Sequence, residues 1–325
     1  MKKNFIYKKL YFELFRIREI EKRISKEYKN MRMRCPVHLS IGQESIAVGV
    51  CQNLLKNDEI VTAHRSHAHY LAKGGNLKKM IAELYGKITG CAGGKGGSMH
   101  LIDLDANVVA AVPIVGSTIP IGVGRAWANK LNKKNNIVVI FFGDGATEEG
   151  VFFESLDFSI LQNLRVLFIC ENNNYSVYTN IKKRQNINRK IYKVANSLGL
   201  KSYKIHTHNI HDVYEKTKKA VKEMRKKPGP VFFEINTFRD IEHCGPNQDD
   251  YLNYRSAKDI NFWRKKDQLY NSEKYILKKN LMKTKELNKI KNKIFNEINR
   301  AFEFAKKSPY PKKKDLHKNI YKKLI

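Results

Sequence analysis

One short segment combines residue types that bind a metal ion and a diphosphate. Asp144 stands between two glycines in Gly143-Asp144-Gly145-Ala146, and Asn173 follows 29 residues after Asp144 in an asparagine-rich turn. Glycines let the backbone approach a diphosphate closely, and Mg²⁺ favours a few protein oxygens beside phosphate oxygens. Ordinary glycine and asparagine turns would explain each segment separately. The pair at this spacing instead favours a Mg²⁺–diphosphate site.

The elements around this pair predict a sheet that brings both residues to one edge. Three short runs rich in Val, Ile and Phe occur at 137–142, 165–170 and 231–235, with helical patterns between them. This pattern predicts an α/β fold, a doubly wound and mostly parallel sheet flanked by helices. Asp144 and Asn173 follow the first two runs. Ligands bind at the carboxyl ends of strands in such sheets, so we expect the site there.

Helical patterns are predicted toward both ends of the chain. Apolar residues recur at helical spacing over 6–30, and 76–90 has a helical pattern as well. The glycine-rich segment 90–97 can only be loop. A Lys-rich amphipathic helical region is expected over 259–307, followed by a tail over 308–325.

The region around Asp144 closely resembles the thiamine-diphosphate motif of one enzyme family. That family is the α subunits of the E1 components of 2-oxo acid dehydrogenases, which include the pyruvate, branched-chain and acetoin dehydrogenases. The resemblance extends in unbroken order from about residue 30 to 256, and it is carried by HLSIGQES (38–45), HRSHAHYLAKG (64–74), AELYGKITGCAGGKGGSMHL (82–101), IVGSTIPIGVG (114–124) and GDGATEEGVFFESLDFSILQNLRVLFICENNNYSVYT (143–179). It implies a thiamine-diphosphate-binding domain over 31–256. The helical patterns outside it predict an N-terminal amphipathic helix over 1–30 and a Lys-rich helical region with a tail over 257–325.

The resemblance implies a metal and diphosphate site as well. Asp144 and Asn173 match the side-chain ligands of Mg²⁺, and Tyr175 matches the residue that adds a backbone carbonyl ligand. Gly145 and Ala146 match the backbone that contacts the diphosphate.

Four further positions complete the implied site. Arg65 matches the arginine that binds the diphosphate, a suitable use for a planar side chain with several donors. Val115 matches the segment that supports the aminopyrimidine ring. His38 matches a substrate-facing histidine, and His243 matches a histidine on an active-site loop near the diphosphate. The resemblance therefore implies catalytic roles for His38 and His243.

Several residues depart from the family pattern. His64 stands where the family usually has Tyr before the arginine, and Pro113 replaces a usual Gly or small residue. The loop serine that is phosphorylated in mitochondrial relatives is Cys244 here, so that control is not expected. Glu242 precedes His243, and a pair between them would raise the basicity of the imidazole.

The closely spaced histidines His64, His67 and His69 could suggest a second metal site. The sequence offers no carboxylate or cysteine pairing for them, so a second metal site is not expected.

The resemblance also implies the reaction and the partners. Thiamine diphosphate with Mg²⁺ would support decarboxylation of a small 2-oxo acid, and the acyl group would pass to a lipoyl-bearing E2 transferase. In the family a separate E1 β subunit supplies the glutamate that protonates the pyrimidine ring, so an α₂β₂ heterotetramer is expected. An alternative stays open, a thiamine-diphosphate-dependent decarboxylase or carboligase of secondary metabolism that uses an aldehyde or another acceptor.

Composition limits the other partners. Of 325 residues, 62 are Lys or Arg and 31 are Asp or Glu, a net charge of +31. Nearly half of the excess positive charge lies in 256–325, almost entirely as Lys. This region lacks the motifs of proteins that recognise nucleic acids. A solvated basic surface is expected there, and no nucleic acid partner. The sequence has no apolar run long enough to span a membrane, and its five widely spaced cysteines favour a cytoplasmic setting.

Overall fold

A parallel sheet forms the centre of the computed structural model, which describes residues 2–206 and 209–318. The sheet has 6 strands in the order β2-β1-β3-β4-β8-β7, and each neighbouring pair is parallel. Its strands are β1 (Glu59–Ala63), β2 (Val108–Val112), β3 (Val138–Gly143), β4 (Val166–Asn172), β7 (Lys201–His206) and β8 (Val231–Asn236). A separate antiparallel hairpin joins β5 (Tyr175–Ser176) to β6 (Thr179–Asn180).

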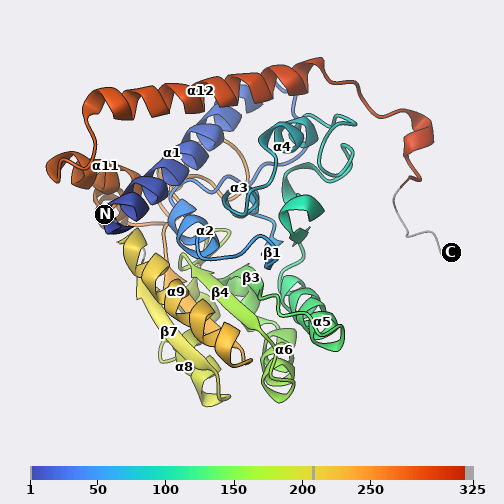
Figure 1. Cartoon of the computed structure of the whole chain (residues 1–325), viewed down its shortest axis with the longest axis vertical. Coiled ribbons are helices and arrows are strands. Elements are labelled where there is room, and N and C mark those ends of the chain that lie inside the picture. The colour runs from blue at the N-terminus through green and yellow to red at the C-terminus, as the bar shows by residue number, and fades with distance from the viewer. Residues whose placement is uncertain (1, 207–208, 319–325) are drawn as a thin grey trace.

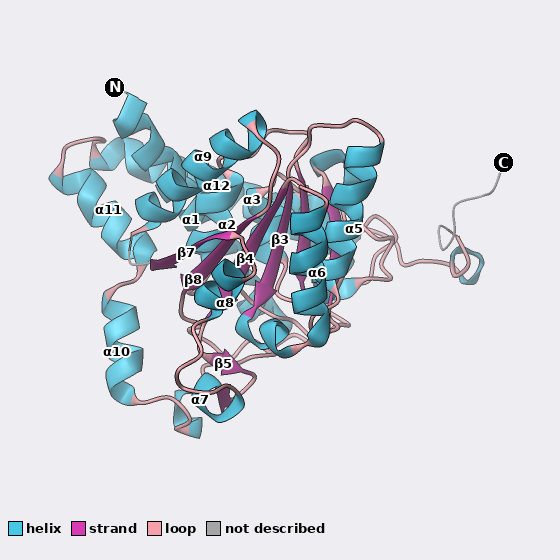
Figure 2. Cartoon of the chain, turned by 90° about the horizontal axis from the view of Figure 1, so that it is seen from below, coloured by secondary structure: helices cyan, strands magenta, loops and turns pink. Residues whose placement is uncertain are grey.

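Helices cover both faces of this sheet (Figures 1 and 2). One face carries α5, α6 and α8, and the other carries α2, α3 and α9, over which α1, α4, α11 and α12 form a further layer. The helices are α1 (Lys2–Tyr28), α2 (Glu44–Cys51), α3 (His67–Ala72), α4 (Leu77–Leu84), α5 (Thr118–Leu131), α6 (Gly150–Leu161), α7 (Ile181–Arg184), α8 (Ile191–Ser197), α9 (Ile210–Lys226), α10 (Ala257–Lys265), α11 (Gln268–Lys278) and α12 (Thr284–Lys307).

Both faces of the central strands are apolar, which explains their continuous hydrophobic runs. In β3, Val139 and Phe141 belong to the core on the α2 and α9 side. Val138, Ile140 and Phe142 belong to the core under α5 and α6. A strand that is buried on both sides needs apolar residues at every position, as is typical of parallel sheets. The predicted doubly wound α/β fold is confirmed, with β3, β4 and β8 at the three expected runs.

The terminal segments also form the expected helices. The helix over 6–30 is α1, and the region 259–307 contains α10, α11 and α12, of which α12 lies across α1 and α4 (Figure 1). The helix expected over 76–90 is shorter, because α4 ends at Leu84 and Gly86 follows with φ of +65°. The end of the predicted tail, 319–325, lies outside the described residues. In the part of the chain that the structure describes, no helix has the length and apolar content to cross a membrane.

The strand order defines one crevice for a ligand. From β1 the chain moves outward to β2, then returns to β3 on the other side of β1. Open parallel sheets bind ligands where the strand order reverses in this way, beyond the carboxyl ends of the strands. His64 and Arg65 follow β1 directly, and Asp144 follows β3. The fold therefore places these residues at the edge where a ligand is expected.

Candidate active site

A cavity at this edge gathers every residue that the sequence indicated for the site. It encloses about 220 Å³. The indicated residues that line it are His38, Arg65, Val115, Asp144, Gly145, Ala146, Asn173, Tyr175 and His243. Residues spread along two thirds of the chain thus share one surface, because several strand ends and loops meet there.

The carboxylate of Asp144 is buried and oriented by an arginine. Asp144 begins a short 3₁₀ helix, Asp144–Glu148, immediately after β3. Arg184 on α7 pairs with Oδ2 of Asp144 and also with Glu148. The side chain of Arg184 is 12% exposed and is not among those that line the cavity. Burial raises the pKa of Asp144, and the charge of Arg184 opposes that rise.

The side-chain amide of Asn173 is oriented by two hydrogen bonds. The backbone N–H of Tyr175 donates to Oδ1 of Asn173 over 2.9 Å, and Nδ2 of Asn173 donates to Oε1 of Gln43 over 3.0 Å. An amide oxygen has two lone pairs, so Oδ1 can still accept or coordinate. Asn173 and Asp144 therefore offer the cavity an amide oxygen and a carboxylate, a donor set that suits Mg²⁺.

Two buried guanidinium groups make the cavity attractive to anions. Arg65 donates from Nη1 to the carbonyl oxygen of Leu39 over 2.7 Å and from Nη2 to that of His243 over 2.9 Å. Burial and the neighbouring Arg239 lower the pKa of Arg65 to about 9, which leaves it charged at neutral pH. Glu171, at the end of β4, also lines the cavity and opposes this charge. The fixed positive charge fits a ligand that carries a diphosphate or a carboxylate.

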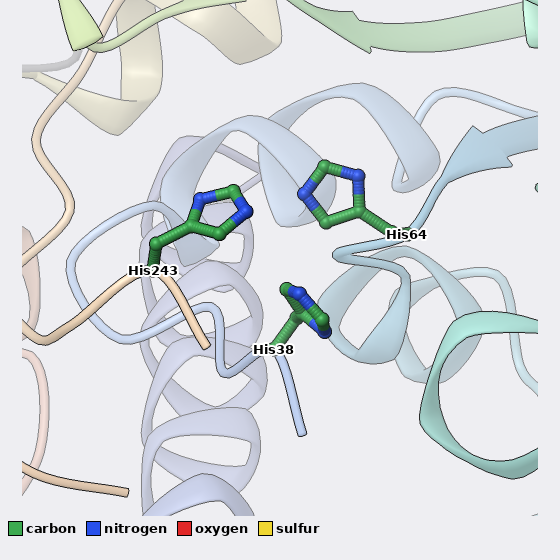
Figure 3. Close-up of side chains that lie close together, drawn as sticks. All are labelled: His38, His64 and His243. Atoms are coloured by element: carbon green, nitrogen blue, oxygen red, sulfur yellow. The ribbon is translucent and has the colours of Figure 1, made fainter. Parts of the chain in front are cut away.

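Three histidines point toward one another beside these arginines (Figure 3). The ring centroids of His38 and His64 are 4.8 Å apart, and each is 5.2 Å from that of His243. Burial, with nearby Arg65, lowers the pKa of His38 to about 3, of His64 to about 2 and of His243 to about 3. All three imidazoles are therefore neutral at physiological pH. Nδ1 of His38 is buried and has no hydrogen-bond partner among the described residues, as expected if a ligand completes the site.

The hydrogen bonds of His243 indicate what this histidine cluster can bind. One ligand nitrogen from each ring lies within 4.8 Å of the others, close enough to share a metal ion. However, Arg239 and Arg65 approach Nδ1 of His243 at 3.2 and 3.4 Å, and a guanidinium can only donate. Nε2 therefore carries the proton, whereas a metal-bound histidine donates from its other nitrogen. The cluster suits an anionic oxygen better than a metal cation.

The sequence left open a pair between Glu242 and His243 and offered no carboxylate partner for His67 or His69, and the structure decides both points. Glu242 does not pair with His243, because its Oε1 accepts the backbone N–H of Asn247 over 2.7 Å and the loop closes on itself. The pKa of His243 is lowered rather than raised, since burial and two arginines outweigh any effect of Glu242. His67 and His69 do have carboxylate partners, Glu21 and Glu171.

The carboxylate partners of His67 and His69 could not be predicted from local sequence, because they come from distant segments. Nδ1 of His67 lies 2.8 Å from Glu21, and Nε2 of His69 lies 3.1 Å from Glu171. Each imidazole pairs with a different carboxylate, so the two do not form one metal site.

Sequence reasoning assigned no role to Gln43, Glu171, Arg184 or Arg239, which contact the site. Glu171 directly follows a predicted strand and could have been found by the rule that located Asp144. Gln43 lies within the matched segment 38–45, and Arg239 lies four residues before His243. Arg184 lies among several basic residues, 40 positions after Asp144, and no local pattern distinguishes it.

Comparison with known proteins gives consistent matches over nearly the whole chain. The family described as dehydrogenase E1 component matches residues 13–314. A pyruvate dehydrogenase E1 component subunit alpha of Rickettsia bellii is 33% identical over 315 residues, 97% of this chain and 95% of that protein. The subunit alpha of acetoin:2,6-dichlorophenolindophenol oxidoreductase of Bacillus subtilis is 33% identical over 313 residues, 96% of this chain and 92% of that protein. A mitochondrial pyruvate dehydrogenase E1 component subunit alpha of Dictyostelium discoideum is 33% identical over 310 residues, 95% of this chain and 80% of that protein.

Proposed function

The chain belongs to the dehydrogenase E1 component family, and from this premise we propose that it is the α subunit of a 2-oxo acid dehydrogenase E1 enzyme. The family depends on thiamine diphosphate, and its α subunits generally pair with a β subunit. The reaction we propose is decarboxylation of a small 2-oxo acid, pyruvate or a close relative, with transfer of the acyl group to a lipoyl carrier of an E2 transferase.

The main support for this proposal is the set of residues that share the cavity. Asp144 and Asn173 present oxygen ligands to the same cavity into which Arg65, His38 and His243 project. This set of residues suits both the cofactor and the substrate. It has hard oxygen ligands for Mg²⁺ and hydrogen-bond donors for a diphosphate and a carboxylate.

We propose distinct roles for the residues that would hold the cofactor. Asp144 and Asn173, with the carbonyl of Tyr175, would bind Mg²⁺, while the backbone at Gly145 and Ala146 would bind the diphosphate.

Arg65 would add charge-assisted hydrogen bonds to the diphosphate, and His243 would lie beside it. Val115 is 53% exposed in this chain, and it is available to support the aminopyrimidine ring. Bound thiamine diphosphate would supply the carbanion chemistry.

The chain's own residues would bind and orient the substrate. His243 presents an N–H at Nε2 because its Nδ1 faces two arginines. His38 projects into the same cavity as a neutral imidazole, so it can hydrogen-bond to a substrate oxygen without adding charge. Arg65 and Arg239 provide the positive charge that favours binding of a carboxylate.

The proposal also covers the oligomeric assembly and the domain boundaries of this chain. We infer an α₂β₂ heterotetramer in which the β subunit completes the active site. We also infer a cofactor-binding domain over 31–256, flanked by the helix of 1–30 and the Lys-rich region of 257–325. The five cysteines are free, which agrees with a cytoplasmic setting.

The test is co-expression of the chain with its β partner, followed by assay of 2-oxo acids with thiamine diphosphate and Mg²⁺. We expect CO₂ release that requires both subunits, and acylation of an added lipoyl domain. Strong turnover by the α chain alone would contradict the proposed assembly. Condensation with an aldehyde, without lipoyl acylation, would instead identify the enzyme as a carboligase.

A further inference from the structure

A buried chain of side chains connects three distant segments beneath the cavity. Glu21 on α1, His67 at the start of α3 and Ser98 in the 3₁₀ helix Gly97–Met99 are 0%, 0% and 1% exposed. Nδ1 of His67 lies 2.8 Å from Oε1 of Glu21, and Nε2 of His67 lies 2.7 Å from Oγ of Ser98. We call these three residues the buried relay.

Both ends of the buried relay accept backbone N–H groups of one short segment. The N–H of His38 donates to Oγ of Ser98 over 3.3 Å, and the N–H of Ser40 donates to Oε2 of Glu21 over 2.8 Å. These partners fix which group donates in each hydrogen bond of the buried relay. Glu21 accepts with both oxygens, so His67 donates from Nδ1, and Nε2 is left to accept the hydroxyl hydrogen of Ser98.

The arrangement resembles a Ser-His-carboxylate triad, but its burial excludes a nucleophilic role. The serine of such a triad must reach the substrate. Ser98 is almost completely buried, and the active-site cavity is lined by its neighbour Met99 and not by Ser98. The hydroxyl instead contacts the backbone of His38, whose imidazole does line the cavity.

We propose that Glu21, His67 and Ser98 are positioning residues that fix the backbone of residues 38–40 and thereby aim the imidazole of His38 into the active site. The inference rests on the proposed function in one respect, that His38 faces the substrate. The buried relay holds the N–H groups of residues 38 and 40, while Arg65 holds the carbonyl oxygen of Leu39. With donors and acceptors of three consecutive residues fixed, this segment has little freedom to shift.

The glycine-rich loop before Ser98 is itself anchored. The carboxylate of Glu83 accepts four backbone N–H groups over 2.7 to 3.1 Å, from Ala92, Gly94, Gly96 and Gly97. The backbone that precedes Ser98 is therefore held in place by hydrogen bonds. This explains in physical terms why a loop rich in glycine can still place one hydroxyl accurately.

The test compares Ser98→Ala and Glu21→Gln with a matched control, Ser159→Ala, in the complex with the β subunit. Ser159 is also a fully buried serine, but among the described residues its hydroxyl donates to the carbonyl oxygen of Leu156 within its own helix. Hydrogen exchange resolved at residues 38 and 40 is the first readout. We expect S98A to speed exchange at the His38 amide and E21Q to speed it at the Ser40 amide, each by about tenfold. S159A should change neither.

Kinetics supply the second readout. We expect S98A to lower kcat/KM for the 2-oxo acid about ten- to a hundredfold, because small displacements of a catalytic group are costly. In a His38→Ala background the same substitution should have almost no further effect, since the buried relay acts through His38.

Two results would overturn the inference. One is unchanged exchange at residues 38 and 40 in folded S98A and E21Q. The other is an equal loss of kcat/KM from S98A with and without His38, which would indicate general loosening of the fold. If the complex decarboxylates no 2-oxo acid, the proposed function fails, while the exchange measurements still test the buried relay.

Discussion

Replacing Arg184 by methionine removes the only described cation that holds the carboxylate of Asp144. The side chains of Arg184 and Asp144 are 12% and 2% exposed, so the pair is almost fully desolvated. Removing one partner of a buried ion pair typically costs about 3–5 kcal/mol, because the remaining charge has no counter-ion. We expect the free energy of unfolding of R184M to fall by this amount in the absence of ligands. At about 2 °C per kcal/mol, the thermal midpoint would fall by roughly 6–10 °C.

We expect the cofactor to rescue this variant. Mg²⁺ bound at Asp144 would replace the lost positive charge, so thiamine diphosphate with Mg²⁺ should raise the midpoint more in R184M than in the wild type. Thermal unfolding of the complex, with and without these ligands, measures the difference.

The control for this experiment is Arg225→Met. Arg225 pairs with Asp58, which is also fully buried but does not line the cavity. R225M should lose stability, yet its gain on adding ligands should equal that of the wild type. Equal ligand-induced gains in R184M and R225M would refute the assignment of Asp144 to the metal.

The pKa values of the three cavity histidines are lowered to about 3, 2 and 3, so the unfolded chain binds protons below pH 6.5 that the folded chain excludes. Urea midpoints of the ligand-free complex should therefore fall as the pH drops from about 6.5 toward 3, and His64→Asn should reduce that slope. Glu83→Ala should lower the free energy of unfolding by about 3 kcal/mol or more, since it leaves four N–H groups without their acceptor; urea midpoints equal to wild type would contradict this. Gly42→Ala should destabilise by about 1–3 kcal/mol, because φ is +94° and a Cβ would lie 2.4 Å from the carbonyl oxygen of Phe238, and calorimetry of the variant checks it.

The features that sequence predicted well are those with a local physical cause. Strands β3, β4 and β8 are buried on both faces, so each appears as a continuous apolar run. Asp144 and Asn173 were found because polar residues directly after such runs must lie at the carboxyl edge of the sheet. The resemblance to a family then indicated residues, such as His38 and His243, whose neighbours in the fold come from other segments.

The features that sequence missed depend on contacts between distant segments or on weak local patterns. β7 is an edge strand whose residues are mostly exposed, so it lacks the apolar run of a central strand. The pairing of His67 with Glu21 joins residues 46 positions apart on two helices. The pKa of His243 is lowered first by burial and then by Arg65 and Arg239, which come from distant segments, so the adjacent Glu242 gave no guide to it.

The proposed cofactor site is tested most directly by a crystal structure of the complex with thiamine diphosphate and Mn²⁺, which replaces Mg²⁺ and can be located by anomalous scattering. We expect one Mn²⁺ bound by the side chains of Asp144 and Asn173 and by the carbonyl of Tyr175, with the diphosphate against Arg65. An ion bound by His38, His64 and His243, or a cofactor bound outside this cavity, would contradict the proposed site.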